Sequence, residues 1–372
     1  MRPAMRRLWL RLHRWVGLCM GVVLSLVALA GASLIVVKPL DRMINPALFA
    51  TAAPDATHVS LDAVRQALVT RYGPQASFTL RPPREHADTL WVHVRGPWDG
   101  TAYLDPVTAR VLGERGEYEG LANFLFELHS SLLLGDAGRP LMAGLALTYV
   151  FLLASGLALW WPSNWKATWT LRFKSGLTAS LFDVHRVGGS ALGLLIAISV
   201  FSGAYMAWKP LSGFITALAG DSATLPPKVA PWQGDGAALD AMTSRAAVLF
   251  PGARIGYVQL PGQPSSPIRF RLKLPDDPHP NGLTSVWFHP ANGEVLAVHR
   301  WDQLEAGAHA NAYIYPLHTG VLGGVWHEAA NALFGLALSC LGATGVWLWA
   351  RRRRKASAPH GNTRAQAGIR GA

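Results

Sequence analysis

Residues 12–21 read LHRWVGLCMG, and residues 184–193 read VHRVGGSALG. In both stretches a His-Arg pair stands at the foot of a long apolar run, and glycines follow four and eight residues after the histidine. Positions four residues apart share one face of an α-helix. The two stretches therefore predict two equivalent membrane helices, each with a histidine at its foot and bare backbone beside it.

The apolar residues of the chain are concentrated rather than spread. Of its 372 residues, 50% are hydrophobic and 15% are charged, and the mean hydropathy is +0.20. This composition is too apolar for an ordinary soluble enzyme. Four runs have about the 20 residues that cross a bilayer as a helix. They are Trp15–Val37, Leu141–Trp161, Val187–Trp208 and Ala329–Ala350.

The positive charge of the chain is gathered in three segments. Segments 1–14, 162–186 and 351–372 hold 16 of the 34 Lys and Arg residues but a single acid, Asp183. This pattern places both termini and the middle segment in the cytoplasm, with segments of roughly 38–140 and 209–328 outside. The net charge of +12 thus reports topology, and we expect no nucleic-acid binding. The outer segments are slightly acidic overall and contain no contiguous ligand motif.

The first apolar run also resembles a secretory signal, with Ala30-Gly31-Ala32 as a candidate cleavage site. Its length, and its recurrence later in the chain, favour retention as a membrane helix. The two cysteines, Cys19 and Cys340, both lie inside predicted spans. They allow no disulfide framework, iron-sulfur pattern or covalent c-type haem attachment. We interpret them as packing residues.

The second half of the sequence repeats the first. The matching segments are 12–40 with 184–211, 123–129 with 312–318, and 156–160 with 345–349. The first match aligns Gly31 with Gly203. Each half thus predicts a span, an outer module, a histidine segment at the membrane surface and a second span. Two copies in one orientation would be related by an axis along the membrane normal.

Each outer module is predicted to be a small α+β unit, with an N-cap serine at Ser60 in the first. The helix, strands and turn are expected at 60–68, 90–94, 101–104 and 105–108 in the first module, and at 237–250, 268–274, 285–288 and 289–293 in the second. The predicted fold class is a membrane protein with four transmembrane α-helices, two small extracytoplasmic α+β modules and an internal tandem duplication.

These elements divide the chain into eight segments. The first half comprises the cytoplasmic N-terminus with the first span (1–37), module 1 (38–118), and a histidine segment with the second span (119–161). A cytoplasmic loop (162–186) leads to the third span (187–208), module 2 (209–305), a histidine segment with the fourth span (306–350) and a basic cytoplasmic tail (351–372).

Four of the 13 histidines fall at membrane boundaries, in pairs that the repeat makes equivalent. His13 and His185 stand at the cytoplasmic ends of the first and third spans, and His129 and His318 stand just before the second and fourth. An ionisable residue at such a depth is costly without a partner. Haem iron takes axial ligands on opposite sides of its ring, and imidazole is a common choice. The pairs therefore predict two b-type haems, one near each face.

Neighbouring residues fit the same hypothesis. Room for the porphyrin would come from Gly17, Gly21, Gly189 and Gly193, and partners for its propionates from Arg14 and Arg186. In the competing interpretation, small residues serve helix packing and each His-Arg pair anchors a helix at the interface. The duplication favours haem, while the choice between one haem and two stays open.

A further histidine, His327, follows His318 in the second copy and has no counterpart in the first. It could replace His318 as the ligand or serve the substrate side. We favour His318, because only His318 obeys the duplication. Around His129, residues 121–135 predict a short amphipathic helix that lies on the membrane surface. The remaining histidines have no tight metal-ligand spacing.

Haem near each face would carry electrons across the bilayer, so we expect an oxidoreductase. The sequence contains no strand followed by Gly-x-Gly-x-x-Gly, and its cytoplasmic segments are too short for a flavin or nicotinamide domain. The electron donor must then be external, either quinol in the membrane or a separate cytoplasmic reductase. This chemistry requires no acid-base or nucleophilic machinery.

Residues 105–112 and 289–296 resemble the closing hairpin of PepSY domains. Together with residues 156–162, the His-Arg spans resemble PepSY-associated transmembrane proteins of bacterial inner membranes, over about residues 5–352. Within that family the layout resembles ferrisiderophore reductases of the FoxB type. That resemblance implies an inner-membrane protein that reduces ferric siderophore outside the membrane. Reduction would release the iron, because oxygen-donor chelators hold Fe(II) far more weakly than Fe(III).

Two other functions fit the sequence. A haem-free sensor or regulatory protein would bind a peptide or protease through the outer modules and use the spans only as anchors. A di-haem cytochrome b would pass electrons to a partner protein and have no siderophore site. The first would be colourless, and the second would be coloured but unresponsive to ferric siderophore.

Overall fold

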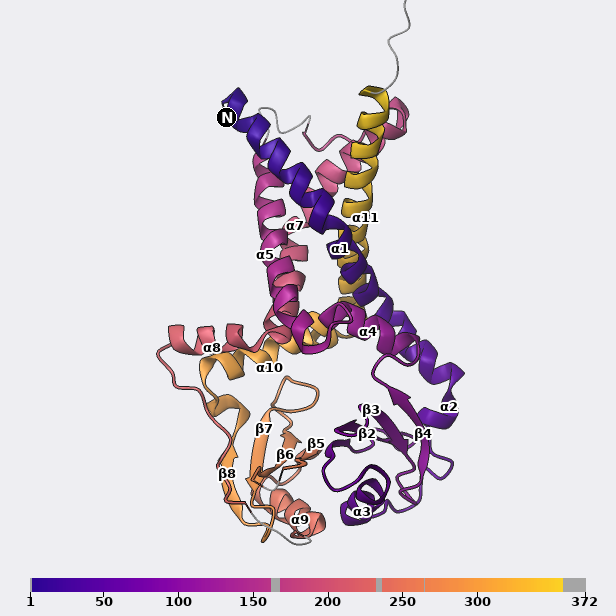
Figure 1. Ribbon diagram of the computed structural model, residues 1–372, viewed down its shortest axis with the longest axis vertical. Coiled ribbons are helices and arrows are strands. Elements are labelled where there is room, and N and C mark those ends of the chain that lie inside the picture. Colours follow the sequence, from indigo (N-terminus) through magenta and orange to yellow (C-terminus); the bar gives the residue numbers. More distant parts are fainter. Residues whose placement is uncertain (1, 162–167, 232–235, 264, 357–372) are drawn as a thin grey trace, which may run out of the picture. The chain divides into compact units, whose positions relative to one another are not determined.

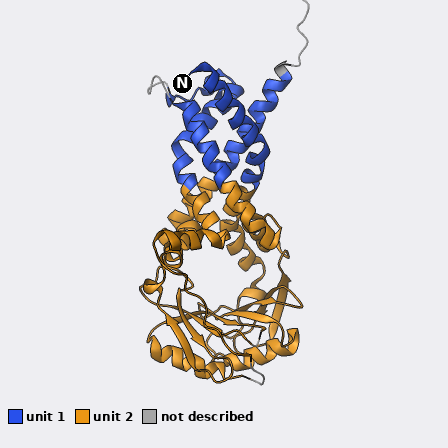
Figure 2. Ribbon diagram, turned by 60° about the vertical axis from the view of Figure 1, so that its left-hand side comes forward, with its two compact units in different colours: residues 1–26, 147–197, 336–372 blue, residues 27–146, 198–335 orange. Residues whose placement is uncertain are grey.

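The computed structural model describes residues 2–161, 168–231, 236–263 and 265–356. The chain divides into two compact units (Figure 2). Unit 1 contains residues 1–26, 147–197 and 336–372, and unit 2 contains residues 27–146 and 198–335. Parts of the predicted cytoplasmic loop and tail, at 162–167 and 357–372, lie outside the described residues.

Four of the described helices are long and apolar enough to cross a membrane, as the four runs predict. They are α1 (Pro3–Ile44), α5 (Gly138–Trp160), α7 (Leu177–Ala207) and α11 (Gly324–Ala356) (Figure 1). α1 continues beyond the predicted end at Val37. Its last turns are held by ion pairs from Asp41 to Arg115 and from Arg42 to Asp88, each 2.5 Å long.

Small and hydroxyl-bearing residues let the helices of unit 1 approach closely. A Cβ at Gly342 of α11 would collide with Ser25 of α1, and Ser339 Oγ donates to the Ser25 carbonyl oxygen at 2.9 Å. Between α5 and α7, Tyr149 Oη donates to the Gly193 carbonyl oxygen at 2.8 Å. These polar groups find partners inside the protein because lipid offers none.

Unit 2 contains one eight-stranded antiparallel sheet with the order β4-β3-β2-β1-β5-β6-β7-β8. Its strands are β1 (Ser77–Arg81), β2 (Leu90–Arg95), β3 (Gly100–Leu104), β4 (Val111–Gly116), β5 (Arg254–Leu260), β6 (Ile268–Lys273), β7 (Thr284–Phe288) and β8 (Val295–His299). Sequence patterns predicted ranges for β2, β3, β6 and β7, and the predicted hairpins at 105–112 and 289–296 reach the first residues of β4 and β8, but no range was predicted for β1 and β5. The strands of the two predicted modules belong to one sheet, because β1 pairs with β5.

Helices lie on both sides of this sheet (Figure 1). α3 (Leu61–Tyr72) and α9 (Leu239–Leu249) cover one face, and α4 (Leu121–Ser131), α8 (Lys209–Leu218) and α10 (Ala306–Thr319) lie on the other side. The short helices of this unit are α2 (Pro46–Phe49), η1 (Gly135–Ala137), η3 (Trp301–Gln303) and η4 (Val321–Gly323), and η2 (Phe173–Ser175) belongs to unit 1.

The N-termini of α3 and α9 cap each other. Ser60 Oγ accepts the Ala63 N–H at 3.2 Å, which confirms the predicted cap of α3. In addition, Asp240 of α9 accepts the Leu61 N–H at 3.0 Å, and Asp62 of α3 accepts the Leu239 N–H at 3.0 Å. Carboxylates are favoured at helix N-termini, where backbone N–H groups are unpaired. These reciprocal bonds hold the two predicted modules together next to the β1/β5 pairing.

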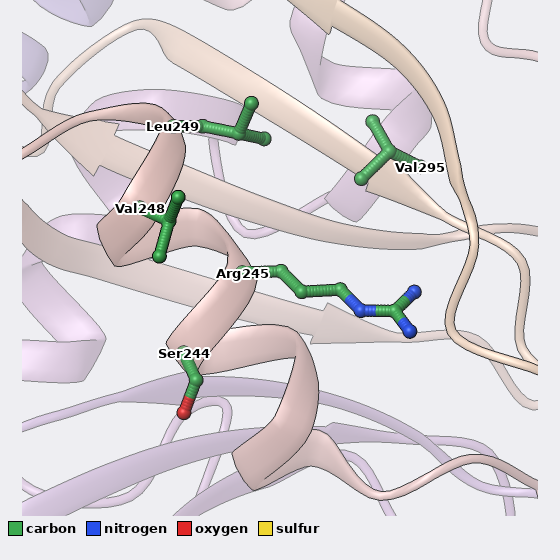
Figure 3. Close-up of a pocket in the computed structure, with 5 residues that line it drawn as sticks. All are labelled: Ser244, Arg245, Val248, Leu249 and Val295. Carbon is green, nitrogen blue, oxygen red and sulfur yellow. The ribbon is translucent and has the colours of Figure 1, made fainter.

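A cavity of about 340 Å³ lies between α9 and the strand that carries Val295 (Figure 3). Ser244, Arg245, Val248 and Leu249 line its other side, and Arg245 extends from α9 across it. The Arg245 guanidinium donates to the Gly293 carbonyl oxygen. Since that bond anchors the turn before β8, we interpret the cavity as a gap beside a structural arginine.

The core of unit 2 yields a test of stability. Phe270 on β6 is fully buried, and its ring lies 5.2 Å from that of Phe288 on β7. We expect Phe270→Ala to cost about 3–5 kcal/mol of unfolding free energy, measured by thermal unfolding of the detergent-solubilised protein. Val248→Ala is the control, because Val248 is 79% exposed and should change stability by less than about 0.5 kcal/mol. Equal effects would contradict this core.

The connection from β6 to β7 yields a test of pH dependence. His279 is 4% exposed, and its Nδ1 accepts the Asn281 N–H at 3.1 Å, so the ring must be neutral. Burial, helped by Arg271 and Lys273, lowers the pKa of His279 from 6.5 to about 3.

The free energy of unfolding is therefore unaffected by the titration of His279 above pH 6.5. It decreases as the pH falls from 6.5 toward 3, because the unfolded ring binds a proton there and the buried ring does not. The slope is at most about 1.4 kcal/mol per pH unit. We expect His279→Asn to lose stability less steeply than the wild type between pH 7 and pH 4, measured by urea unfolding. Parallel pH profiles of the two proteins would show that His279 does not titrate in this way.

Candidate functional site

His13 of α1 and His185 of α7 face each other in unit 1. Their ring centroids lie 6.4 Å apart, with an interplanar angle of 87°. His13 Nδ1 is 2.8 Å from Ser155 Oγ on α5, whose hydroxyl donates to the Leu152 carbonyl oxygen at 3.1 Å. The Ser155 oxygen is therefore the acceptor for the Nδ1–H of His13.

His185 is held in the same way by α11. Its Nδ1 lies 3.0 Å from the Leu341 carbonyl oxygen and 3.0 Å from Thr344 Oγ1. A carbonyl oxygen only accepts hydrogen bonds, so Nδ1 carries the proton and Nε2 carries a lone pair. Within the described part of the chain, neither His13 nor His185 makes a hydrogen bond through Nε2.

His129 of α4 and His318 of α10 form a second pair, in unit 2. Their ring centroids are 5.8 Å apart, and the rings are inclined by 22°. His129 Nδ1 is 2.9 Å from the Val27 carbonyl oxygen of α1, and His318 Nδ1 is 3.0 Å from the Ser199 carbonyl oxygen of α7. Both rings again carry the Nδ1 proton and leave Nε2 without a hydrogen bond to any described residue.

A glycine lies against each of the four histidine rings. A Cβ at Gly156 or Gly345 would stand 3.4 or 3.5 Å from Cε1 of His13 or His185. One at Gly31 would overlap the ring of His129, and one at Gly203 would come within 2.8 Å of His318 Cε1. Both glycine pairs stand at positions that the predicted repeat makes equivalent, but only the structure connects them with the histidines.

The four glycines predicted to border a porphyrin have different surroundings. Cβ atoms at Gly17 and Gly189 would make ordinary contacts of 3.7 Å with leucine side chains. Gly21 has no described atom within 4 Å of that position, whereas at Gly193 the space is filled by Leu153. At Gly193 the side chain of Leu153 on α5 packs against the backbone of α7, whereas the space beside Gly21 is open.

The two arginines predicted to bind propionates also differ. The Arg186 guanidinium donates to the Thr168 and Thr170 carbonyl oxygens and lies 3.2 Å from Asp183, so it holds the segment before α7. The side chain of Arg14, which lies inside α1, makes no hydrogen bond or ion pair with any described residue. A propionate role thus stays a prediction for both residues. Arg14 could bind a propionate without losing a contact, whereas Arg186 would first have to release Thr168, Thr170 or Asp183.

His327 lies in the first turn of α11, and its ring has no contact with His129 or His318 among the described ring contacts. A Cβ at Gly323 would instead meet its Cβ. The structure thus brings together the two predicted pairs and leaves His327 apart from them.

Each pair offers two ligands to a metal. Among the described residues no cluster of three or more His, Cys, Asp or Glu side chains could hold a metal ion, so neither pair has the ligand set of a structural zinc site. A histidine ring nitrogen binds a transition-metal ion at a distance of about 2.0–2.1 Å. The same nitrogen lies about 1.1 Å from the centroid of its own ring. Two axial imidazoles on one iron thus have centroids about 6.3 Å apart.

The observed centroid distances of 6.4 and 5.8 Å are close to that value. The interplanar angle is not restrictive, because each ring can rotate about its own iron–nitrogen bond. Histidines that bind a metal usually donate their other ring N–H to a carbonyl or a similar acceptor, and each of these four rings donates its Nδ1–H in this way. In their chemistry and in their centroid spacing, both pairs are therefore suited to supply two imidazole ligands to a haem.

The sequence model of a known family, the PepSY-associated TM region, matches residues 10–352. The match includes all four histidines and most of both units. A comparison with curated proteins gave no match.

Proposed function

Because this chain belongs to the family of PepSY-associated transmembrane proteins, we propose that it is a haem-containing reductase of the bacterial inner membrane. It would reduce ferric siderophore on the outer side and release the iron. The observation that supports this proposal most is the pair of histidine sites. In each, two rings fixed through Nδ1 lie at the spacing of two axial ligands on one iron.

An anchoring role does not account for this arrangement. A histidine that anchors a helix at the interface points toward water or lipid headgroups. These rings instead contact each other in pairs and donate to acceptors on neighbouring helices. A ring placed in this way, with a free Nε2, is suited to holding a metal centre.

When bound, haem with two imidazole ligands supplies one-electron transfer. The residues of the chain would keep the rings in the Nδ1–H tautomer and orient them. Each Fe(III) would gain one electron, which an external donor loses. Because the sequence has no nucleotide-binding segment, that donor would be quinol or a cytoplasmic reductase.

We further infer that the chain is a tandem duplication with both termini in the cytoplasm. His13 against Gly156 and His185 against Gly345 are equivalent contacts, as are His129 against Gly31 and His318 against Gly203. The basic residues of segments 1–14, 162–186 and 351–372 support the orientation. The sheet of unit 2 would then be periplasmic, where imported ferric siderophore is met.

Haem content tests the ligand assignment. We expect the purified wild type to contain two haems per chain, by haemochrome quantitation and a reduced-minus-oxidised spectrum. His13→Ala should lose one haem and His129→Ala the other, since each removes one axial ligand. His58→Ala is the control, because His58 is exposed. A colourless folded protein would favour the sensor alternative, and two haems in both variants would sink the assignment.

The glycines behind the outer rings give a second test. Gly203→Ala places a methyl group against His318, so we expect loss or a spectral shift of one haem with the other unchanged. Gly213→Ala is the matched control, because Gly213 has nothing within 4 Å of its Cβ position. Spectra identical to the wild type in Gly203→Ala would show that the His318 ring is not held against this glycine in a haem site.

Addition of substrate tests the reductase activity. Anaerobically reduced wild-type protein should be reoxidised when a ferric siderophore is added, as followed by the haem absorbance. The same siderophore loaded with gallium, which is not reduced, should leave the spectrum unchanged. Haem that stays reduced with every ferric siderophore tried would favour a cytochrome b that serves a partner protein.

A further inference from the structure

The sheet face that looks away from α3 and α9 carries an aligned row of side chains. Directly opposite residues on antiparallel strands have Cβ atoms about 4.5–5.5 Å apart. The register aligns Tyr103, Trp91 and Arg81 on β3, β2 and β1, and Tyr257, Arg271, Ser285 and His299 on β5 to β8. Leu80 pairs with Val258, so the same register sets Arg81 opposite Tyr257.

Five cations gather along this row, and we call them the basic face: Arg81, Arg84, Arg269, Arg271 and Lys273. Arg81 is close enough to Arg84 and Arg271 to be repelled by both, and Arg269 is repelled by Arg271. None of the five forms an ion pair with an acid within the described ranges.

Asp88 accepts the backbone N–H of Arg84 at 3.3 Å but is ion-paired with Arg42. Asp277 interacts with Arg271 and Lys273 but is committed to the backbone. Its carboxylate accepts the N–H of His279 at 2.9 Å and the N–H of Leu283 at 2.5 Å, and burial raises its pKa. The positive charge of the basic face is therefore largely uncompensated. Burial lowers the pKa of Arg269 to about 10 and also lowers that of Arg81.

Two guanidinium nitrogens of the basic face are buried without a partner. Arg81 Nε and Arg271 Nη2 make no hydrogen bond to any described residue. Arg271 otherwise donates to the Gly282 carbonyl oxygen and to Tyr257 Oη, whereas the side chain of Arg81 makes no hydrogen bond to any described residue. Buried polar atoms in proteins are nearly always paired, so unpaired ones call for an explanation. A bound anion would supply the missing acceptors.

The basic face also adjoins the elements that carry the outer histidine pair. Tyr315 of α10, one turn before His318, has its ring 4.5 Å from that of His279 and interacts with Arg81. Lys38 of α1 is close enough to interact with both Arg81 and His129. An anion held by Arg81 would therefore lie in the neighbourhood of the His129/His318 pair.

We propose that the basic face binds a small anionic metal chelate through its carboxylate or other anionic oxygen atoms, at the seam between β1 and β5. Arginine suits this role, because its planar fork of donors matches a carboxylate. Trp91 and Tyr257, which flank Arg81 in the register, add flat surfaces for the ligand body. That the chelate carries Fe(III) rests on the proposed function, whereas the anion site does not.

Binding of a redox-inert chelate to the full-length protein in detergent tests the site. Ga(III)–citrate, which is anionic and is not reduced, serves as the probe, and the neutral Ga(III) tris(acetohydroxamate) is compared with it by calorimetry. We expect Ga(III)–citrate to bind, the neutral complex to bind at least about tenfold more weakly, and Arg81→Gln to weaken Ga(III)–citrate about tenfold or more.

Arg81→Lys keeps the charge and should retain part of the affinity. Arg110→Gln is the matched control, because Arg110 is exposed on the turn between β3 and β4 and should leave binding unchanged. Since the side chain of Arg81 makes no hydrogen bond to any described residue, its replacement should not lower the melting temperature. Unchanged Ga(III)–citrate affinity in Arg81→Gln, or equal affinity for the neutral complex, would overturn the proposal.

Metal-free citrate separates a chelate site from a general anion site, and binding as tight as that of the gallium complex would overturn the chelate assignment. Neither haem nor electron transfer enters these measurements. If the protein is colourless but binds Ga(III)–citrate through Arg81, the anion site is supported and the reductase proposal is contradicted. If the protein contains haem but does not bind Ga(III)–citrate, the anion site is contradicted and the haem assignment is supported.

Discussion

The rest of this structure depends on one constraint: a histidine ring among apolar helices must place its N–H on an acceptor inside the protein, because lipid offers none. In all four cases the acceptor is a carbonyl or hydroxyl oxygen of a neighbouring helix, and it takes the Nδ1–H. The glycine against each ring gives it room. Histidine, acceptor and glycine together fix the direction of the free Nε2 lone pair, and this set occurs four times.

The second organising contact is the seam in unit 2. Pairing of β1 with β5 converts two small sheets into one, and the reciprocal bonds of Asp62 and Asp240 fasten the covering helices. This seam buries the edges that two separate sheets would expose. It also brings Arg81 opposite Tyr257 and close to Arg271, so the contact that stabilises the sheet also concentrates positive charge on the sheet face that looks away from α3 and α9.

Local patterns predicted much of the fold, and their failures have local causes. The cap at Ser60 and the alternation in β2, β3, β6 and β7 place those elements where the structure has them. β4 reads VLGERG, in which two glycines and two charges interrupt the alternation. In β5 the buried position 256 is a glycine, because a Cβ there would meet the Asn281 backbone. The extension of α1 depends on Arg115 and Asp88, which no local pattern reveals.

By itself, the sequence determined the four apolar helices and singled out the histidines that the structure brings together in pairs, because apolar length and residue spacing are local properties. The tertiary structure decided which ring nitrogen is free and which glycines border the rings, since both depend on a neighbouring helix. The tertiary structure also creates the basic face, because it gathers arginines from different strands on one side of the sheet. Arg81 and Arg271 are far apart in the sequence, in two outer segments that are slightly acidic overall. Only the long-range pairing of β1 with β5 brings their charges together.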